Sequence, residues 1–502
     1  MVATQVVPLF EAHLKSEDDA MGSKISKQVS FLAQETVIAP VGAKCSVGTA
    51  VVVGLNMTLG TGPLTLPFAF AQAGLILGSV FLGFCCLLAY ITATFIIETL
   101  MLENADRFEQ AEEEWFVRSE ALHDGADGMG LKELMRQRRP DKVYKIRERI
   151  EMGEMGRRVF PWIFHRLLYM CIFLHIFGCL CVYSVALVAA VESFLPEETA
   201  DRGVVVLGLA AVLLPLSLVN VQKLRELQFL IMILRALAIL ALIGGGCYVA
   251  ATSEAGGEAV GESSTPEGEV EADGDVWMWG RIPLANPARL PCLYSNTVLA
   301  FMVHHALPGY VAPLDRSSDA PKAVAVSYIV AYAILLVLAG TALWAFGVDV
   351  PPLYNLAFSQ LPQVVNKLLR GYPLSLIAVY PVIAISLRNN LMNFFGVAPP
   401  DGDGKATGKD LAASAIASMP PLCVAYFTSN VQGIIKIFAG YFGLSLMLFW
   451  PCMLLKYTRE SIAAATDDFP LKSRWGTNTV VAAVGAAWAT AIMFNTYRFF
   501  LA

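Results

Sequence analysis

The chain has 502 residues, of which 56% are hydrophobic, and a mean hydropathy of +0.57. This apolar content excludes an ordinary soluble protein and indicates an integral membrane protein. The formal net charge of −6 carries little information because the charges are segregated by loop, and we expect the lipid bilayer and a small substrate, but no nucleic acid, as partners. The ten cysteines lie mostly in apolar segments without CxxC or Cys/His spacing, so neither a metal site nor a cofactor is predicted.

Eleven apolar segments are interpreted as membrane crossings, since about 20 apolar residues span the hydrocarbon core. They are residues 47–73, 75–100, 162–194, 203–221, 226–251, 290–313, 321–347, 371–393, 410–427, 432–455 and 475–498. The pattern predicts an all-α integral membrane protein with one membrane domain at 47–500, preceded by a polar tail at 1–46. Glu98, at the cytoplasmic end of the second crossing, is interpreted as a solvated or paired surface group rather than a proton carrier.

The first predicted crossing contains its own helix breakers. Gly60, Gly62 and Pro63 fall within four residues, and Pro67 follows. In a helix interior, glycine costs about 1 kcal/mol and proline about 3 kcal/mol relative to alanine. Pro63 also lacks an N–H group and disfavours helical geometry at the residue before it. We therefore predict two half-helices joined by a few extended residues.

A second break is predicted in the sixth crossing, at HHALPGYVAP, where Pro308 and Gly309 follow a histidine pair. Irregular backbone at membrane depth is tolerated only against protein or a water-filled cavity. Two broken helices at corresponding places in two halves of a chain indicate a transporter binding site. The alternative is a pair of proline kinks in ordinary packed helices.

The loop charges predict an orientation. Most Lys and Arg residues fall on the side that holds the N-terminal tail and the charged 101–161 loop, whereas the 252–289 loop on the other side is acidic. By the positive-inside rule the N-terminus is cytoplasmic. This pattern assigns a side of the bilayer and does not identify a particular membrane.

Within the 101–161 loop, the spacing of apolar residues from Lys142 to Arg158 predicts an amphipathic helix at the inner surface. The alternative interpretation is a plug or regulatory contact beneath a transport path.

Three basic side chains inside the apolar segments are candidate functional residues. Arg235 falls well within the fifth crossing, where a charge costs about 2.5–3.5 kcal/mol on insertion scales, so we expect a partner in the protein interior. The alternative is that it snorkels to the near interface. His304 and His305 precede the second break and are candidates to bind substrate, carry a proton or line a gate. Simple packing, with hydrogen bonds to freed carbonyls, is the other interpretation.

Several motifs together resemble the amino acid/auxin permease family. They are GTGPLTLPFAFAQAG at 60–74, FIIE at 95–98, ERIEMGEMG at 148–156, NVQK at 220–223, CLYS at 292–295, HHALPG at 304–309 and ISLRNN at the end of the eighth crossing. The resemblance implies an eleven-span inverted-repeat fold with discontinuous helices one and six. The two five-span repeats are then 47–251 and 290–455, followed by a final span at 475–498. Members of the family typically move amino acids, driven by Na⁺ or H⁺.

The resemblance also implies which residues form the site. Those expected to bind substrate are Leu59, Gly60, Thr61, Gly62, His304, His305 and Ala306. Those expected to couple an ion are Asn56, Ser386 and His304. Those expected to shape or gate the path are Pro63, Pro308, Gly309 and Arg235. Ser386 lacks the adjacent hydroxyl that usually accompanies a Na⁺ site, which favours H⁺ as the coupling ion.

Two functions fit the sequence. The first is a secondary active transporter of amino acids or similar small zwitterions that works by alternating access. The second is a membrane sensor or scaffold that binds an amino acid and signals through the 101–161 loop. An enzyme is not supported, because no HExxH, GxSxG or paired intramembrane Asp is present.

Overall fold

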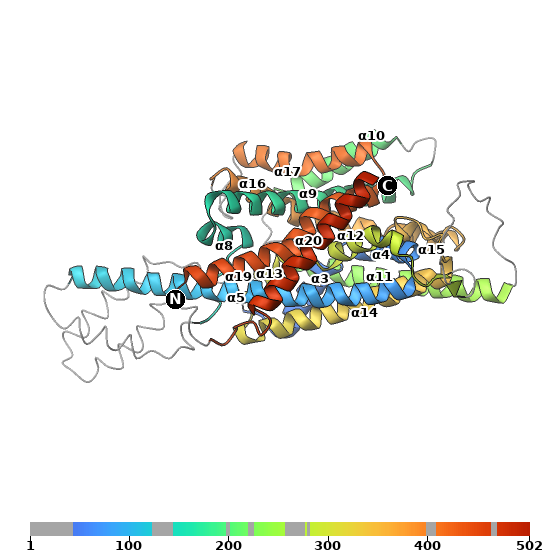
Figure 1. Ribbon diagram of the computed structural model, residues 1–502. Coiled ribbons are helices and arrows are strands. Elements are labelled where there is room, and N and C mark those ends of the chain that lie inside the picture. The colour runs from blue at the N-terminus through green and yellow to red at the C-terminus, as the bar shows by residue number, and fades with distance from the viewer. Residues whose placement is uncertain are drawn as a thin grey trace.

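The computed structural model of the chain describes residues 44–122, 144–196, 201–218, 225–256, 277–278, 282–397, 408–462 and 469–501. These residues are almost entirely helical, as predicted, and the long helices run roughly along one direction (Figure 1). The described part of the acidic 252–289 loop contains one small hairpin, in which β1 (Trp277–Met278) pairs antiparallel with β2 (Ile282–Pro283). The predictions for the tail at 1–43 and for the acidic stretch at 257–276 lie outside the described residues.

In the described part of the chain, one helix follows another, and no long β-strand lies between them. The helices of the first half are α3 (Val47–Thr58), α4 (Gly62–Ala73), α5 (Leu75–Leu122), α8 (Met152–Val159), α9 (Trp162–Glu192), α10 (Arg202–Leu216) and α11 (Arg225–Gly256). Those of the second half are α12 (Leu290–Phe301), α13 (Leu307–Val311), α14 (Ala320–Phe346), α15 (Gln363–Arg370), α16 (Tyr380–Phe394), α17 (Gly408–Phe427), α18 (Val431–Ile437), α19 (Trp450–Ser461) and α20 (Asn478–Leu501). The short 3₁₀ turns are η2 (Pro287–Arg289), η3 (Ser317–Asp319), η4 (Tyr354–Leu356) and η5 (Tyr372–Ala378), and the π-helical segments are η6 (Phe438–Gly443) and η7 (Ser445–Phe449).

Many of these helices are built to lie in lipid. In the described part of the chain, seven helices are long and apolar enough to cross a membrane, and the bent pair of helices α3 and α4 makes an eighth candidate span. Two further apolar helices, α10 and α17, are shorter. Large apolar side chains are exposed on outward faces, including Val80 (67%), Leu207 (68%) and Met493 (72%). Such faces are stable next to acyl chains and costly in water.

The structure confirms a break in each of the two predicted crossings, with two details corrected. The residues that join the first pair of half-helices are not extended, and the second break ends at Ala306 because 307–311 of the predicted 304–313 stretch are helical. The first crossing is interrupted at Leu59–Thr61, where α3 and α4 are bent by 56°. The sixth is interrupted at Met302–Ala306, between α12 and α13. The two broken crossings pack together, α12 along α4 and α13 against α3, while α14 supports both α3 and α4.

Helix α9 lies at the centre of the opposite side of the bundle and packs against α16, α17, α18 and η6. Gly178 of α9 permits the close approach of η6, because a Cβ atom at this position would overlap Phe438. The apolar stretch Val431–Ser461 contains two π-helical segments in its middle, η6 and η7, which the sequence did not predict. Helix α20 runs obliquely across the outside of the bundle (Figure 1).

The prediction of an amphipathic helix from Lys142 to Arg158 is wrong for residues 144–151, which are not helical, and is confirmed from Met152 onwards, where α8 begins. Residues 142–143 lie outside the described part of the chain. Helix α5 extends beyond the predicted second crossing to Leu122. The reason that residues 144–151 are not helical is a set of hydrogen bonds from other elements to their backbone, described below.

Candidate functional site

The break in the first crossing leaves three backbone amides without backbone partners. Among the described residues, no carbonyl accepts a hydrogen bond from the N–H groups of Gly60, Thr61 and Gly62. All three residues are buried, and Pro63 occupies the first turn of α4, where a missing N–H group is harmless. Unpaired N–H groups at the positive end of a helix form a favourable site for an anion.

Two helices enclose these amides. A Cβ atom added at Gly60 would lie 2.8 Å from the Tyr183 hydroxyl of α9, and one added at Gly62 would lie 3.3 Å from the Ala300 Cβ of α12. Ala300 stands two residues before the second break. Glycine is therefore required here for the close approach of neighbouring side chains, and the two breaks lie next to each other.

Arg235 lies in the protein interior one helical turn from the first break. Its side chain is almost fully buried, and its Nη1 atom donates to both the backbone oxygen and the Oδ1 atom of Asn56, each at 2.9 Å. The alternative that it snorkels to the interface is therefore wrong. Its partner is a neutral amide rather than a carboxylate, which the sequence could not indicate because the two residues are distant in the chain.

The two histidines of the second break contact different helices. The Nε2 atom of His304 lies 2.9 Å from the Thr92 hydroxyl and 3.1 Å from the Ala89 carbonyl oxygen, both in α5. The His305 ring instead meets the ring of His175 in α9 edge-on, with centroids 5.7 Å apart. The two imidazoles therefore fix the irregular Met302–Ala306 segment between α5 and α9.

The candidate ion-coupling residues are not all brought together. Asn56 and His304 lie at or beside the two breaks. Ser386 donates to the Val382 carbonyl of its own helix, and α16 packs mainly against α9 and α17. Within the described ranges, no group of three or more His, Cys, Asp or Glu side chains has the geometry of a metal site.

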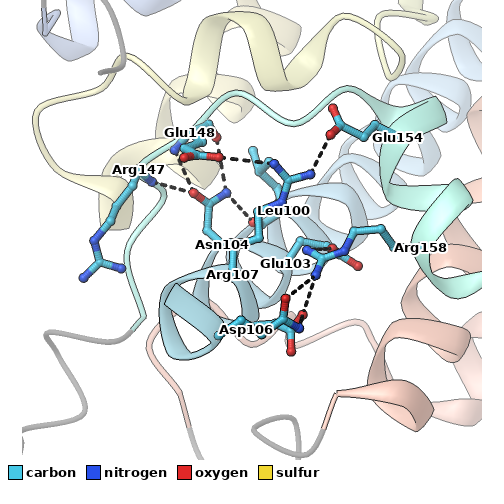
Figure 2. A network of polar contacts seen from close by, with 10 residues as sticks. Leu100, Glu103, Asn104, Asp106, Arg107, Arg147, Glu148, Glu154 and Arg158 are labelled. Atoms are coloured by element: carbon cyan, nitrogen blue, oxygen red, sulfur yellow. Dashed lines mark hydrogen bonds and ion pairs between the residues drawn. The ribbon is translucent and has the colours of Figure 1, made fainter. Parts of the chain in front are cut away.

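A second polar cluster lies in the second half of α5, where residues 144–151 approach it and Arg149 lies near Gly309 of α13. The Asn104 side chain organises it: its Oδ1 atom accepts hydrogen bonds from the N–H groups of Arg147 (2.8 Å) and Glu148 (2.7 Å). Figure 2 shows Asn104 between α5 and this segment. The segment also donates from the Ile146 N–H to the Ser317 hydroxyl at 3.1 Å.

Ion pairs surround Asn104 and tie the segment and α8 to α5 (Figure 2). They are Arg107 with Glu148 (3.2 Å) and Glu154 (2.6 Å), and Arg158 with Glu103 (2.9 Å) and Asp106 (2.8 Å). We call Asn104, these ion pairs and the 144–151 segment the clamp. The clamp reaches the second break, because a Cβ atom at Gly309 of α13 would lie 3.2 Å from Arg149. This arrangement favours the interpretation of a contact beneath the broken helices.

We expect Asn104→Ala to release the clamp while leaving the helices intact. The substitution removes the side-chain acceptor of the Arg147 and Glu148 N–H groups, which are partly buried, and a buried donor left unpaired costs about 1–3 kcal/mol as an upper bound. Limited trypsin digestion, with cleavage sites identified by mass spectrometry, should show cleavage after Arg147 and Arg149 at least several-fold faster than in the parent chain. Gln363→Ala removes an exposed amide from α15, outside the clamp, and should leave the rate unchanged. Equal cleavage rates in all three proteins would contradict the role assigned to Asn104.

The chain was compared with known proteins. Residues 43–114 and 129–495 match the family described as transmembrane amino acid transporter protein. A protein called transmembrane protein 104 homolog from Drosophila melanogaster is 25% identical over 467 residues, covering 81% of this chain and 87% of that protein. Human transmembrane protein 104 is 26% identical over 456 residues, covering 82% and 87%. Among solved structures, a mutant manganese transporter of Eremococcus coleocola is 14% identical, with a TM-score of 0.46 and coverage of 92% and 88%.

Proposed function

Since this chain belongs to the transmembrane amino acid transporter family, we propose that it is a secondary active transporter of amino acids or similar small zwitterions. It works by alternating access and is driven by H⁺ or Na⁺. The fold that we propose has eleven crossings, with inverted repeats at 47–251 and 290–455 and a final span at 475–498. The N-terminus lies in the cytoplasm.

The observation that carries this proposal is the contact between the two helix breaks. The amides of Gly60, Thr61 and Gly62 receive the substrate carboxylate, because they are buried, unpaired and at the positive end of α4. Leu59 lines the same break, and Ala306 with the histidine pair lines the facing one. A carboxylate is the group that all amino acids share, so this site explains recognition of the class.

The clamp then acts on the cytoplasmic side. With the N-terminus inside, the end of α5 and the 144–151 segment face the cytoplasm. The segment contacts α13 through Arg149 and Gly309, so it closes the path beneath the second break. Opening towards the cytoplasm requires these contacts to separate. The two Arg107 pairs and the Arg158–Asp106 pair are partly exposed and separate at low cost, whereas the Arg158–Glu103 pair holds a buried carboxylate and costs more to separate.

Uptake by purified protein in liposomes tests the proposal. A panel of amino acids is offered under an imposed pH gradient and, separately, a Na⁺ gradient. We expect accumulation of at least one amino acid under one gradient, abolished by collapsing that gradient. No gradient-driven uptake of any amino acid by folded protein would contradict the proposal.

A sensor that binds an amino acid without moving it is the second candidate, and the clamp favours it because it joins the site to a charged surface segment. Binding measured by thermal shift without flux, together with a protein partner lost on deletion of residues 130–158, would identify a sensor. Flux that survives this deletion would identify a transporter.

A further inference from the structure

Only part of the hydrogen-bonding capacity of the Arg235 guanidinium is used by the protein. Its Nη1 atom is held by Asn56, but among the described residues Nε and Nη2 have no hydrogen-bond partner. The residue is 2% exposed, so these atoms are shielded from bulk solvent. Buried polar atoms normally have partners, and those that do not require an explanation.

Among the described residues, the charge of Arg235 forms no ion pair. The fully buried carboxylates in this part of the chain are Glu98 and Glu103, and these are bound to Arg459 and Arg158. A buried charge without a partner costs several kcal/mol by order of magnitude, so an arginine is retained in this setting only where something compensates for it. No described residue supplies the compensating anion.

The geometry of the free atoms indicates which anion fits. The Nε–H and the adjacent Nη2–H bonds lie on the same edge of the planar guanidinium and match the two oxygens of a carboxylate. The Arg235 charge lies within electrostatic range of the hydroxyls of Tyr183 and Tyr372. The Tyr372 hydroxyl is itself buried without a partner among the described residues, and the Tyr183 hydroxyl abuts Gly60. The free edge therefore lies in the same neighbourhood as the unpaired amides of the first break.

We propose that Arg235 binds a second carboxylate of the substrate, so that the chain takes an acidic amino acid. The inference rests on the proposed function, in which the amides of Gly60–Gly62 receive the α-carboxylate. Those amides and Arg235 form two separate positive centres, and the described residues place no free buried carboxylate beside them. An acidic amino acid satisfies both centres, whereas its amide counterpart leaves Arg235 without an anion.

Binding to the purified full-length protein tests the proposal, with glutamate and aspartate compared with their isosteres glutamine and asparagine. We expect the wild-type chain to bind the acid at least tenfold more tightly than the matching amide. Arg235→Gln should abolish this preference by weakening acid binding while amide binding persists. Arg202→Gln, in which an arginine anchored on Glu192 and the Ala425 carbonyl is removed, should leave the preference unchanged.

A second variant keeps the test decisive if Arg235→Gln fails to fold. Asn56→Asp supplies a carboxylate from the chain itself, so it should raise thermal stability and remove the preference for acids. A preference for acids that persists in either folded variant would overturn the inference. A wild-type preference for neutral amino acids would overturn it too and leave the proposed function intact. Binding of no amino acid at all would refute the proposed function as well.

Discussion

Replacing Arg459 with methionine is expected to lower the free energy of unfolding by about 3–5 kcal/mol, because it leaves a buried carboxylate without its counter-charge. The side chain of Glu98 in α5 is fully buried. Its two oxygens accept from Nε (2.7 Å) and Nη2 (2.8 Å) of Arg459 in α19, and Oε2 also accepts from the Ser473 N–H at 2.8 Å. This pair joins the second crossing to the end of the tenth.

The double variant Glu98→Gln with Arg459→Met separates the buried charge from the lost contact. It removes the charge together with its partner, so it should be clearly more stable than Arg459→Met alone. Arg149→Met is the matched control, since its ion pair with Glu151 is largely exposed and is expected to contribute at most about 1 kcal/mol. Thermal and denaturant unfolding in detergent measure all three. Equal stabilities for Arg459→Met and Arg149→Met would show that Glu98 does not depend on its partner.

Gly60→Ala is expected to reduce uptake at least tenfold while the protein remains folded. The added methyl group would lie 2.8 Å from the Tyr183 hydroxyl and would partly cover the unpaired amides of the first break. Gly60 does not adopt a positive φ angle, so alanine fits the backbone and the effect is confined to the space beside it.

Gly208→Ala is the matched control, because no atom lies within 4 Å of a Cβ placed there in α10. It should transport as the parent chain does and gain about 0.5–1 kcal/mol of stability. Initial uptake rates in liposomes, normalised to folded protein, compare the two variants. Parental uptake by Gly60→Ala would remove the first break from the transport site.

Local chemistry accounts for what the sequence predicted well. Both breaks appear where glycine and proline make a continuous helix costly, at Leu59–Thr61 and at Met302–Ala306. Glu98 was interpreted as a solvated or paired surface group; it is paired with Arg459, but its side chain is fully buried rather than at the surface. These features depend on the residues themselves or on a strong general rule for charges in apolar surroundings.

Contacts between segments that are distant in the chain account for the structural features that the sequence did not predict. The apolar spacing near 142–158 fits a helix, but Asn104 binds the backbone N–H groups of Arg147 and Glu148, and residues 144–151 are not helical. Nothing in the local sequence links Arg235 to Asn56, and no pattern distinguishes the π-helical segments of the tenth crossing from an ordinary helix. Tertiary hydrogen bonds and packing decide each of these features.

Cysteine accessibility is the most direct test of the claim that the two helix breaks line one substrate site. A membrane-impermeant thiol reagent labels the single variants Thr61→Cys and Ala306→Cys. Gln363→Cys, on the exposed face of α15, is the control. The parent chain gives the background labelling of its own cysteines. The amino acid with the highest uptake should slow labelling of the thiol introduced at either break at least fivefold and leave the control unchanged. Unaltered labelling at either break, at saturating substrate, would contradict a shared site.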